Sequence, residues 1–146
     1  MEINNKLIKA YIFDPPEWFI NNYYKGTHGI VTTHDITDKQ KFINLRIWID
    51  KIILQAPLET RMILIGNKCD LSNERKVTEE EGKKLADEFG MLFFETSAKT
   101  GYNVNFAIET LIADIIKHYK KFEERKIKLK KDDKKTINEK DNRCYK

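Results

Sequence analysis

The sequence predicts an α/β protein built on a parallel, doubly wound sheet. Short apolar runs typical of buried strands alternate along the chain with longer amphipathic segments typical of helices. Because strands that are separated by helices usually pair in parallel, this order favours a sheet with helices on both faces. The length of 146 residues suits a single domain.

The first part of the chain is predicted to form a hairpin and an irregular segment. Residues 1–3 and 7–13 have the composition of strands, and a polar, turn-forming run separates them. The second strand is expected to end at Asp14, because two prolines follow it. Residues 17–24 are predicted to form a short helix.

A strand is expected over residues 29–36, and capping boxes predict the start of two helices further along. Thr37 with Gln40, and Thr78 with Glu81, have the spacing at which two side chains cap the first turn reciprocally. Apolar residues at helical spacing are expected to face the core: Phe42, Leu45, Ile49, Ile52 and Ile53 in the first helix, and Leu85, Ala86 and Phe89 in the second.

Two more strands and a last helix complete the predicted domain. The strands are expected over residues 62–66 and 91–95, and the helix is expected to start at Asn103. Beyond the helix the apolar stripe gives way to Lys, Asp and Glu. We therefore expect a domain over residues 1–122 and a basic, disordered tail over residues 123–146.

The net charge of +4 is unevenly distributed. From Lys120 onward, 12 Lys or Arg face 6 Asp or Glu, a net +6, which leaves −2 for the rest of the chain. The nearly neutral body argues against nucleic acid as a partner, whereas the basic tail favours weak contact with an anionic membrane surface. There is neither a signal peptide nor an apolar run near the roughly 18 residues that span a membrane, so a cytoplasmic location is expected.

Two polar motifs directly follow the apolar runs at 62–66 and 91–95. The carboxyl ends of parallel strands meet at one edge of a sheet, which is where ligands of α/β folds bind. Two ordinary loops rich in turn-forming residues are the alternative interpretation. The residues of the two motifs are the candidate binding site: Asn67, Lys68, Asp70, Ser97, Ala98 and Lys99.

The first motif suits the recognition of guanine. The carboxylate of Asp70 can accept hydrogen bonds from both donors on one edge of guanine, the ring N–H and the exocyclic amine. Adenine presents an acceptor there and would leave the carboxylate unpaired. Asn67 can bond a purine nitrogen or tie neighbouring loops together. Lys68 can lay its aliphatic stem over the base while its ammonium group stays in water.

The second motif has complementary roles. Ser97 can brace its own loop, and the backbone N–H of Ala98 can donate to the guanine oxygen. Lys99 can cover the opposite face of the base. The two motifs together predict a pocket that recognises a guanine base.

These motifs resemble the base-recognition motifs of the Ras superfamily of small GTPases. The flanking sequence at 23–26, 29–31, 34–37 and 42–49 is most similar to the Rab branch. The resemblance implies a P-loop-NTPase-like small GTPase sheet, GTP or GDP as ligand, protein effectors, and a role in vesicle trafficking. It also implies a peripheral position on endomembranes.

The resemblance covers roughly residues 1–120 and begins after the amino-terminal third of a complete domain. The first strand, the phosphate loop and the first helix of the family have no counterpart, so we expect a partial sheet whose central strand is missing. Mg²⁺ is expected only together with such a front segment. Losing about four charge-assisted phosphate contacts, at roughly 1.5–3 kcal/mol each, predicts weak nucleotide binding.

A second departure lies after the strand that ends at Asp14. The family pattern Asp-x-x-Gly-Gln is replaced here by Asp14-Pro15-Pro16-Glu17. The Gly that meets the third phosphate and the Gln that orients water are both absent. We therefore predict no catalytic residue, and hydrolysis of GTP by this chain is doubtful.

Three interpretations stay open: a Rab-like GTPase whose front is missing, a pseudo-GTPase that acts as a protein-binding module, and a gene fragment without function. Lipidation also stays open, because Cys144 stands third from the end, where a C-a-a-X box needs the fourth position.

Overall fold

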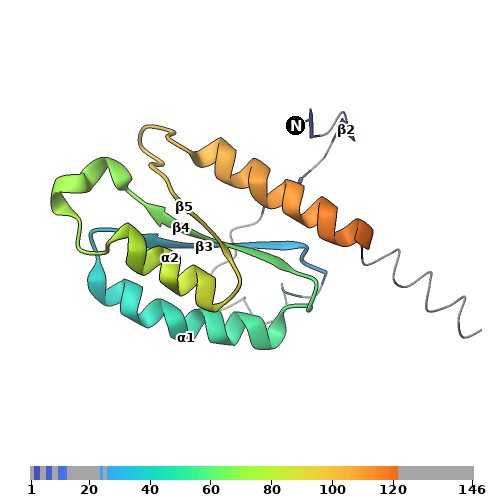
Figure 1. The fold of residues 1–146 in the computed structure, drawn as a ribbon, viewed down its shortest axis with the longest axis horizontal. Helices are drawn as coiled ribbons and strands as arrows, with labels where there is room; N and C mark the ends of the chain where they lie inside the picture. Colours follow the sequence, from blue (N-terminus) through green and yellow to red (C-terminus); the bar gives the residue numbers. More distant parts are fainter. Residues whose placement is uncertain (1, 4–5, 8–9, 13–23, 25, 122–146) are drawn as a thin grey trace, which may run out of the picture. The chain divides into compact units, whose positions relative to one another are not determined.

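The computed structural model describes residues 2–3, 6–7, 10–12, 24 and 26–121, and Figure 1 shows their arrangement. The chain divides into two compact units, Met1–Ile115 and Ile116–Lys146. The labelled strands and helices all belong to the first unit. The predicted tail over 123–146 lies outside the described residues.

The predicted hairpin is present in shortened form. Strand β1 (Glu2–Ile3) pairs antiparallel with strand β2 (Lys6–Leu7). Residues 10–12 belong to no strand, so the strand predicted over 7–13 is wrong at these positions. Asp14 lies outside the described residues. So does the helix predicted over 17–24, except for Tyr24.

The main sheet is parallel, as predicted, with strand order β3-β4-β5. Strand β4 lies in the middle because its side chains are apolar on both faces, which suits a strand that helices cover on each side. It pairs with β3 from Arg61 to Asn67 and with β5 from Ile63 to Gly66. The three strands are β3 (Gly29–Asp35), β4 (Arg61–Asn67) and β5 (Leu92–Glu95).

Helices lie on both faces of this sheet (Figure 1). Helix α1 (Lys39–Gln55) and helix α2 (Glu79–Glu88) cover one face, and a helix over residues 104–121 begins on the other. A short 3₁₀ segment, η2 (Cys69–Glu74), follows β4. Within the described ranges, no helix combines the length and apolar character needed to cross a bilayer.

The two predicted capping boxes have different outcomes. Thr78 caps α2 as predicted: its side chain accepts from the Glu81 N–H (3.2 Å), and the Glu81 carboxylate accepts from the Thr78 N–H (2.9 Å). The box at Thr37 is wrong, because Asp38 caps α1 by accepting from the Lys41 N–H at 3.0 Å. Thr37 instead donates its N–H and its hydroxyl to Asp35.

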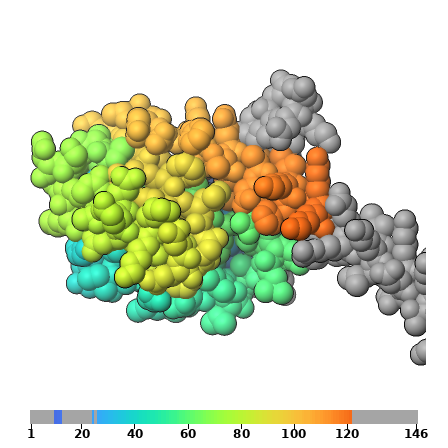
Figure 2. All heavy atoms as spheres, in the orientation of Figure 1, coloured from blue at the N-terminus to red at the C-terminus, as the bar shows by residue number. Residues whose placement is uncertain are grey.

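The core consists of two apolar layers, one on each face of β4. Figure 2 shows that side chains fill the spaces between the ribbons of Figure 1. Of the residues predicted to face the core, Ile53 is a wrong prediction, because 44% of it is exposed. The first layer contains Leu45, Ile49, Ile52, Met62, Leu64, Leu85, Ala86 and Met91, with Phe42 and Phe89 packed against it, and the second contains Ile63, Ile65, Ala107 and Leu111.

The closest approach between α2 and the sheet occurs at Gly82. A Cβ atom at this position would lie 2.6 Å from two ring carbons of Phe93 on β5. Replacing a helical glycine by alanine ordinarily stabilises a helix by about 1 kcal/mol. Here we expect Gly82→Ala to lower the free energy of unfolding by about 1–3 kcal/mol, because either the helix or the Phe93 ring must shift to make room for the methyl group.

Urea unfolding followed by circular dichroism measures this effect. The exposed residue Lys84 on the same helix gives the control, since Lys84→Ala meets no such obstacle. Equal or greater stability of Gly82→Ala would show that α2 accommodates the methyl group without moving.

Candidate functional site

The two predicted motifs lie next to each other in the structure. The loop after β4 and the loop after β5 emerge at the same end of the sheet (Figure 1). Backbone bonds join them: the Thr96 N–H donates to the Gly66 carbonyl at 2.9 Å, and the Cys69 N–H donates to the Thr96 carbonyl at 3.1 Å. The parallel ladder between β4 and β5 therefore continues into the loops.

Side chains of the first motif hold the second motif in place. Asn67, the last residue of β4, accepts a hydrogen bond from the Ala98 N–H through its Oδ1 at 3.0 Å. The N–H that was predicted to donate to the guanine oxygen is therefore bonded within the protein in this structure. The buried Ser97 donates its hydroxyl to Oδ1 of Asp70 at 2.6 Å. Ser97 Oγ in turn accepts from the Thr100 N–H at 3.2 Å. The four residues Asn67, Asp70, Ser97 and Ala98 thus form one interlocked unit.

Two lysines of the motifs border this unit. Lys68 has a left-handed backbone, with φ of 68°, and its side chain is half exposed. Its ammonium nitrogen lies 2.6 Å from Oδ2 of Asp35, at the end of β3. Lys99 is exposed on the second loop. All six predicted residues therefore belong to the same pair of loops.

Lys68 and Asp35 stabilise each other in their charged forms. Partial burial by itself would raise the pKa of the Asp35 carboxyl, but hydrogen bonds from Lys68 and Thr37, together with the Lys68 charge, hold that pKa at about 2. The hydrogen bond to Asp35 raises the pKa of Lys68. Both groups are therefore charged across the neutral range.

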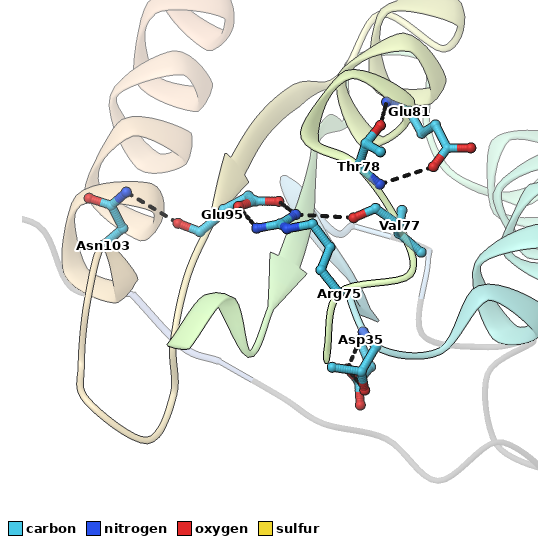
Figure 3. A network of polar contacts seen from close by, with 8 residues as sticks. Asp35, Arg75, Val77, Thr78, Glu81, Glu95 and Asn103 are labelled. Atoms are coloured by element: carbon cyan, nitrogen blue, oxygen red, sulfur yellow. Dashed lines mark hydrogen bonds and ion pairs between the residues drawn. The ribbon is translucent and has the colours of Figure 1, made fainter. Parts of the chain in front are cut away.

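A second ion pair, which the sequence analysis did not predict, lies next to the motifs. Figure 3 shows the Arg75 guanidinium facing the Glu95 carboxylate. The two groups form a bidentate pair, with Nη1 at 2.5 Å from Oε1 and Nη2 at 2.7 Å from Oε2. Both side chains are largely buried, and Nη1 also donates to the Val77 carbonyl at 3.0 Å.

This ion pair fixes the relative position of the two loops. Arg75 caps the end of η2, the segment that contains Asp70, whereas Glu95 ends β5 just before the second motif. The Glu95 carbonyl also accepts from Asn103 Nδ2 at 3.1 Å, which ties in the start of the last helix (Figure 3). The nearness of both residues to the motifs is the signal that could have found them.

A buried histidine lies close to the same network. His34 on β3 is 6% exposed, its Nδ1 has no hydrogen-bond partner among the described residues, and its ring centroid lies 4.8 Å from that of Phe42. Burial lowers the pKa of His34 to about 4, although the negative charges of Glu95 and Asp35 act in the opposite direction. The imidazole is therefore neutral near pH 7.

No cluster of metal-ligating side chains is found among the described residues. Among them, no group of three or more His, Cys, Asp or Glu side chains is placed to hold a metal ion. Asp14 lies outside the described residues. No metal ligand is therefore assigned.

A parallel sheet with helices on both faces, and with interlocked polar loops at the carboxyl ends of its strands, defines an α/β domain of the small-GTPase type. A family model described as the Ras family matches residues 4–117. The chain therefore belongs to the Ras family, and its predicted resemblance to Rab-type small GTPases is confirmed.

Several relatives are about 40% identical to this chain. The GTP-binding protein ypt2 of Schizosaccharomyces pombe is 41% identical over 122 residues, which cover 80% of this chain and 61% of that protein. The Ras-related protein Rab-13 of Mesocricetus auratus is 40% identical over 121 residues, covering 80% and 60%. The Ras-related protein RIC1 of Oryza sativa is 40% identical over 120 residues, covering 79% and 59%. The chain thus matches about three fifths of the length of these relatives.

Proposed function

We propose that this chain binds guanine nucleotides through Asn67, Lys68, Asp70, Ser97, Ala98 and Lys99. The observation that supports the proposal is the interlocking of the two loops. Ser97 uses one lone pair of the Asp70 carboxylate, so the carboxylate keeps acceptor capacity for the two donors of guanine. Two loops that are already held together in this way spend little binding free energy on becoming ordered.

The proposal extends to the biological role. One relative has GTP binding in its name, and the family resemblance implies a nucleotide-dependent switch that meets protein effectors in vesicle trafficking on endomembranes. We propose the same role for the protein to which these residues belong. The basic tail would add weak attraction to an anionic membrane.

A pseudo-GTPase that serves as a protein-binding module is the second candidate. The observation that favours it is the segment Asp14-Pro15-Pro16-Glu17, which lacks the Gly and the Gln of the family pattern. Guanine-nucleotide titration alone does not separate the two candidates, because both keep the base motifs. To separate them, a segment that contains a phosphate loop is joined to the front of this chain. The measurement is whether the affinity for guanine nucleotides then depends on their phosphates.

Asp70→Asn tests the base site directly. The substitution replaces two charge-assisted acceptors by one neutral acceptor and an amide donor. We expect the affinity for GDP to fall by about 100-fold, which corresponds to about 3 kcal/mol. Xanthosine diphosphate, whose base has a carbonyl in place of the exocyclic amine, is expected to become the better ligand because the new amide donates to it.

Isothermal titration with GDP, ADP and xanthosine diphosphate measures these affinities. Asp87→Asn is the matched control, since Asp87 is exposed on α2 and its carboxylate forms an exposed ion pair with Lys83 on the same helix. A wild-type chain without preference for GDP over ADP would overturn the proposal. So would an Asp70→Asn variant that keeps the wild-type preference.

A further inference from the structure

The end of strand β3 supplies a charged group that neither predicted motif contains. Asp35 is the last residue of β3, and it lies directly beside Asn67 in the parallel ladder with β4. This register brings Asp35 next to the first residue of the guanine-recognition motif. Its carboxylate is therefore built into the sheet at the edge from which the binding loops emerge.

Both oxygens of the Asp35 carboxylate have defined partners. Oδ1 accepts from the Thr37 N–H at 2.8 Å and from the Thr37 hydroxyl at 2.7 Å. Oδ2 lies 2.6 Å from the ammonium nitrogen of Lys68. Figure 3 shows Asp35 at the edge of the sheet. Because Thr37 fixes one carboxylate oxygen, the other is held in one orientation, where it pairs with the Lys68 ammonium.

Without this partner, the ammonium of Lys68 has other acidic neighbours. The charges of Asp70 and Asp38 also act on Lys68, after that of Asp35. Asp70 follows Lys68 by two residues, at the start of η2. An ammonium group that moved to Asp70 would compete with the donors of guanine for the same carboxylate.

We propose that Asp35 is a positioning residue for guanine binding: it holds the Lys68 ammonium at the end of β3, so that the aliphatic stem covers the base and the Asp70 carboxylate stays available to it. This inference rests on the proposed guanine site. It assigns to β3 a role in specificity, in addition to the two loops that touch the ligand. Asp35 itself does not touch the base.

The comparison of GDP with inosine diphosphate tests the proposal, because hypoxanthine lacks the exocyclic amine that Asp70 is expected to accept from. We expect Asp35→Asn to lower the GDP affinity about three- to tenfold, the range for a half-exposed charged pair with good geometry. The preference for GDP over inosine diphosphate should fall as well, because the released ammonium occupies Asp70. A merely structural role of Asp35 would weaken both ligands equally.

A double-mutant cycle identifies Lys68 as the group through which Asp35 acts. Lys68→Met keeps an unbranched side chain of similar reach and removes the charge. In that background, Asp35→Asn is expected to change the GDP affinity by less than about twofold. Thr37→Val, which removes one bond to Asp35 but keeps the lysine pair, is the matched control and should also stay within about twofold.

Thermal unfolding establishes that each compared variant is folded. If Asp35→Asn does not fold, Asp35→Glu takes its place in the cycle, since it keeps the charge but displaces the carboxylate by one methylene, and the same sign of coupling is expected. Suppose that the wild type prefers GDP, but that the variants at position 35 leave the GDP affinity and the preference over inosine diphosphate unchanged. This inference is then wrong, whereas the guanine site stands. The inference is also wrong if Asp35→Asn lowers the GDP affinity equally in the wild type and in the Lys68→Met variant. Absence of a GDP preference in the wild type would instead refute the guanine site itself.

Discussion

Glu95→Gln is expected to lower the free energy of unfolding by about 2–3 kcal/mol. The substitution keeps the shape of the side chain but removes the negative charge that faces the Arg75 guanidinium at 2.5 and 2.7 Å. Only 25% of the Arg75 side chain is exposed, so water replaces little of the lost interaction. The cost comes mainly from leaving a largely buried cation without a counter-charge.

A second arginine–glutamate pair in the same chain provides the control. Arg46 and Glu88 approach to 2.6 Å, but their side chains are 57% and 37% exposed. Exposed pairs of this geometry contribute little, and Glu88→Gln is expected to cost less than about 0.5 kcal/mol. Chemical denaturation of both variants measures the difference, and similar losses would show that burial of the Arg75–Glu95 pair has no energetic consequence.

The combined variant Arg75→Met with Glu95→Leu separates the ion pair from the shape of the site. Because neither charge remains, we expect a smaller loss of stability than the sum of the two single substitutions. Binding of GDP should nevertheless weaken, since the loops that present Asp70 and Ser97 lose one of the links between them. An additive loss of stability would mean that the two side chains act independently.

Acid is expected to destabilise the protein through His34 well before the carboxylates titrate. The imidazole has a pKa of about 4 in the folded chain, against an ordinary value of 6.5. Between these values the unfolded chain binds the proton more readily, so stability is complete above pH 6.5 and falls as the pH drops toward 4. A difference of this size corresponds to a total loss of about 3 kcal/mol.

Urea unfolding between pH 7.5 and 3 measures this dependence. His34→Phe keeps an aromatic ring beside Phe42 but cannot take a proton, so its stability should be almost independent of pH down to about 4. Below that, both chains should lose stability as Asp35, whose pKa is about 2, takes up protons more readily when unfolded. Equal slopes for the two chains between pH 6.5 and 4 would mean that His34 accepts its proton without cost.

Local patterns in the sequence predicted the elements that depend on neighbouring residues. The buried strand β4 follows from its continuous apolar run, and the start of α2 follows from Thr78 and Glu81, whose cap is complete within one helical turn. The cap at Thr37 was wrong because two adjacent residues could serve, and the choice depended on Asp35, to which Thr37 donates. Ile53 was placed in the core because helical spacing does not show how wide an arc of α1 is covered.

The candidate site was predictable only where residues stand in a recognisable order. Asn67, Asp70, Ser97 and Ala98 were predicted because each motif is contiguous. The structure brings the two motifs together, and their role in binding guanine stays a prediction. Asp35 and Arg75 were missed because their partners are distant in sequence and no spacing rule connects them. Such residues follow from the register of the sheet, and the sequence pattern does not encode that register.

The left-handed backbone of Lys68 lowers the stability of its loop, whereas the lysine side chain serves the proposed guanine site. A side chain at φ of 68° costs about 1 kcal/mol relative to glycine, which adopts that conformation without strain. Selection for thermal stability alone would therefore favour glycine at this position. The protein would then lose both the ammonium group and the aliphatic stem of Lys68. If the proposed guanine site is correct, a protein that keeps lysine here has a less stable loop but retains a group that contacts the base. The residue at this position would then indicate whether selection favoured stability or binding.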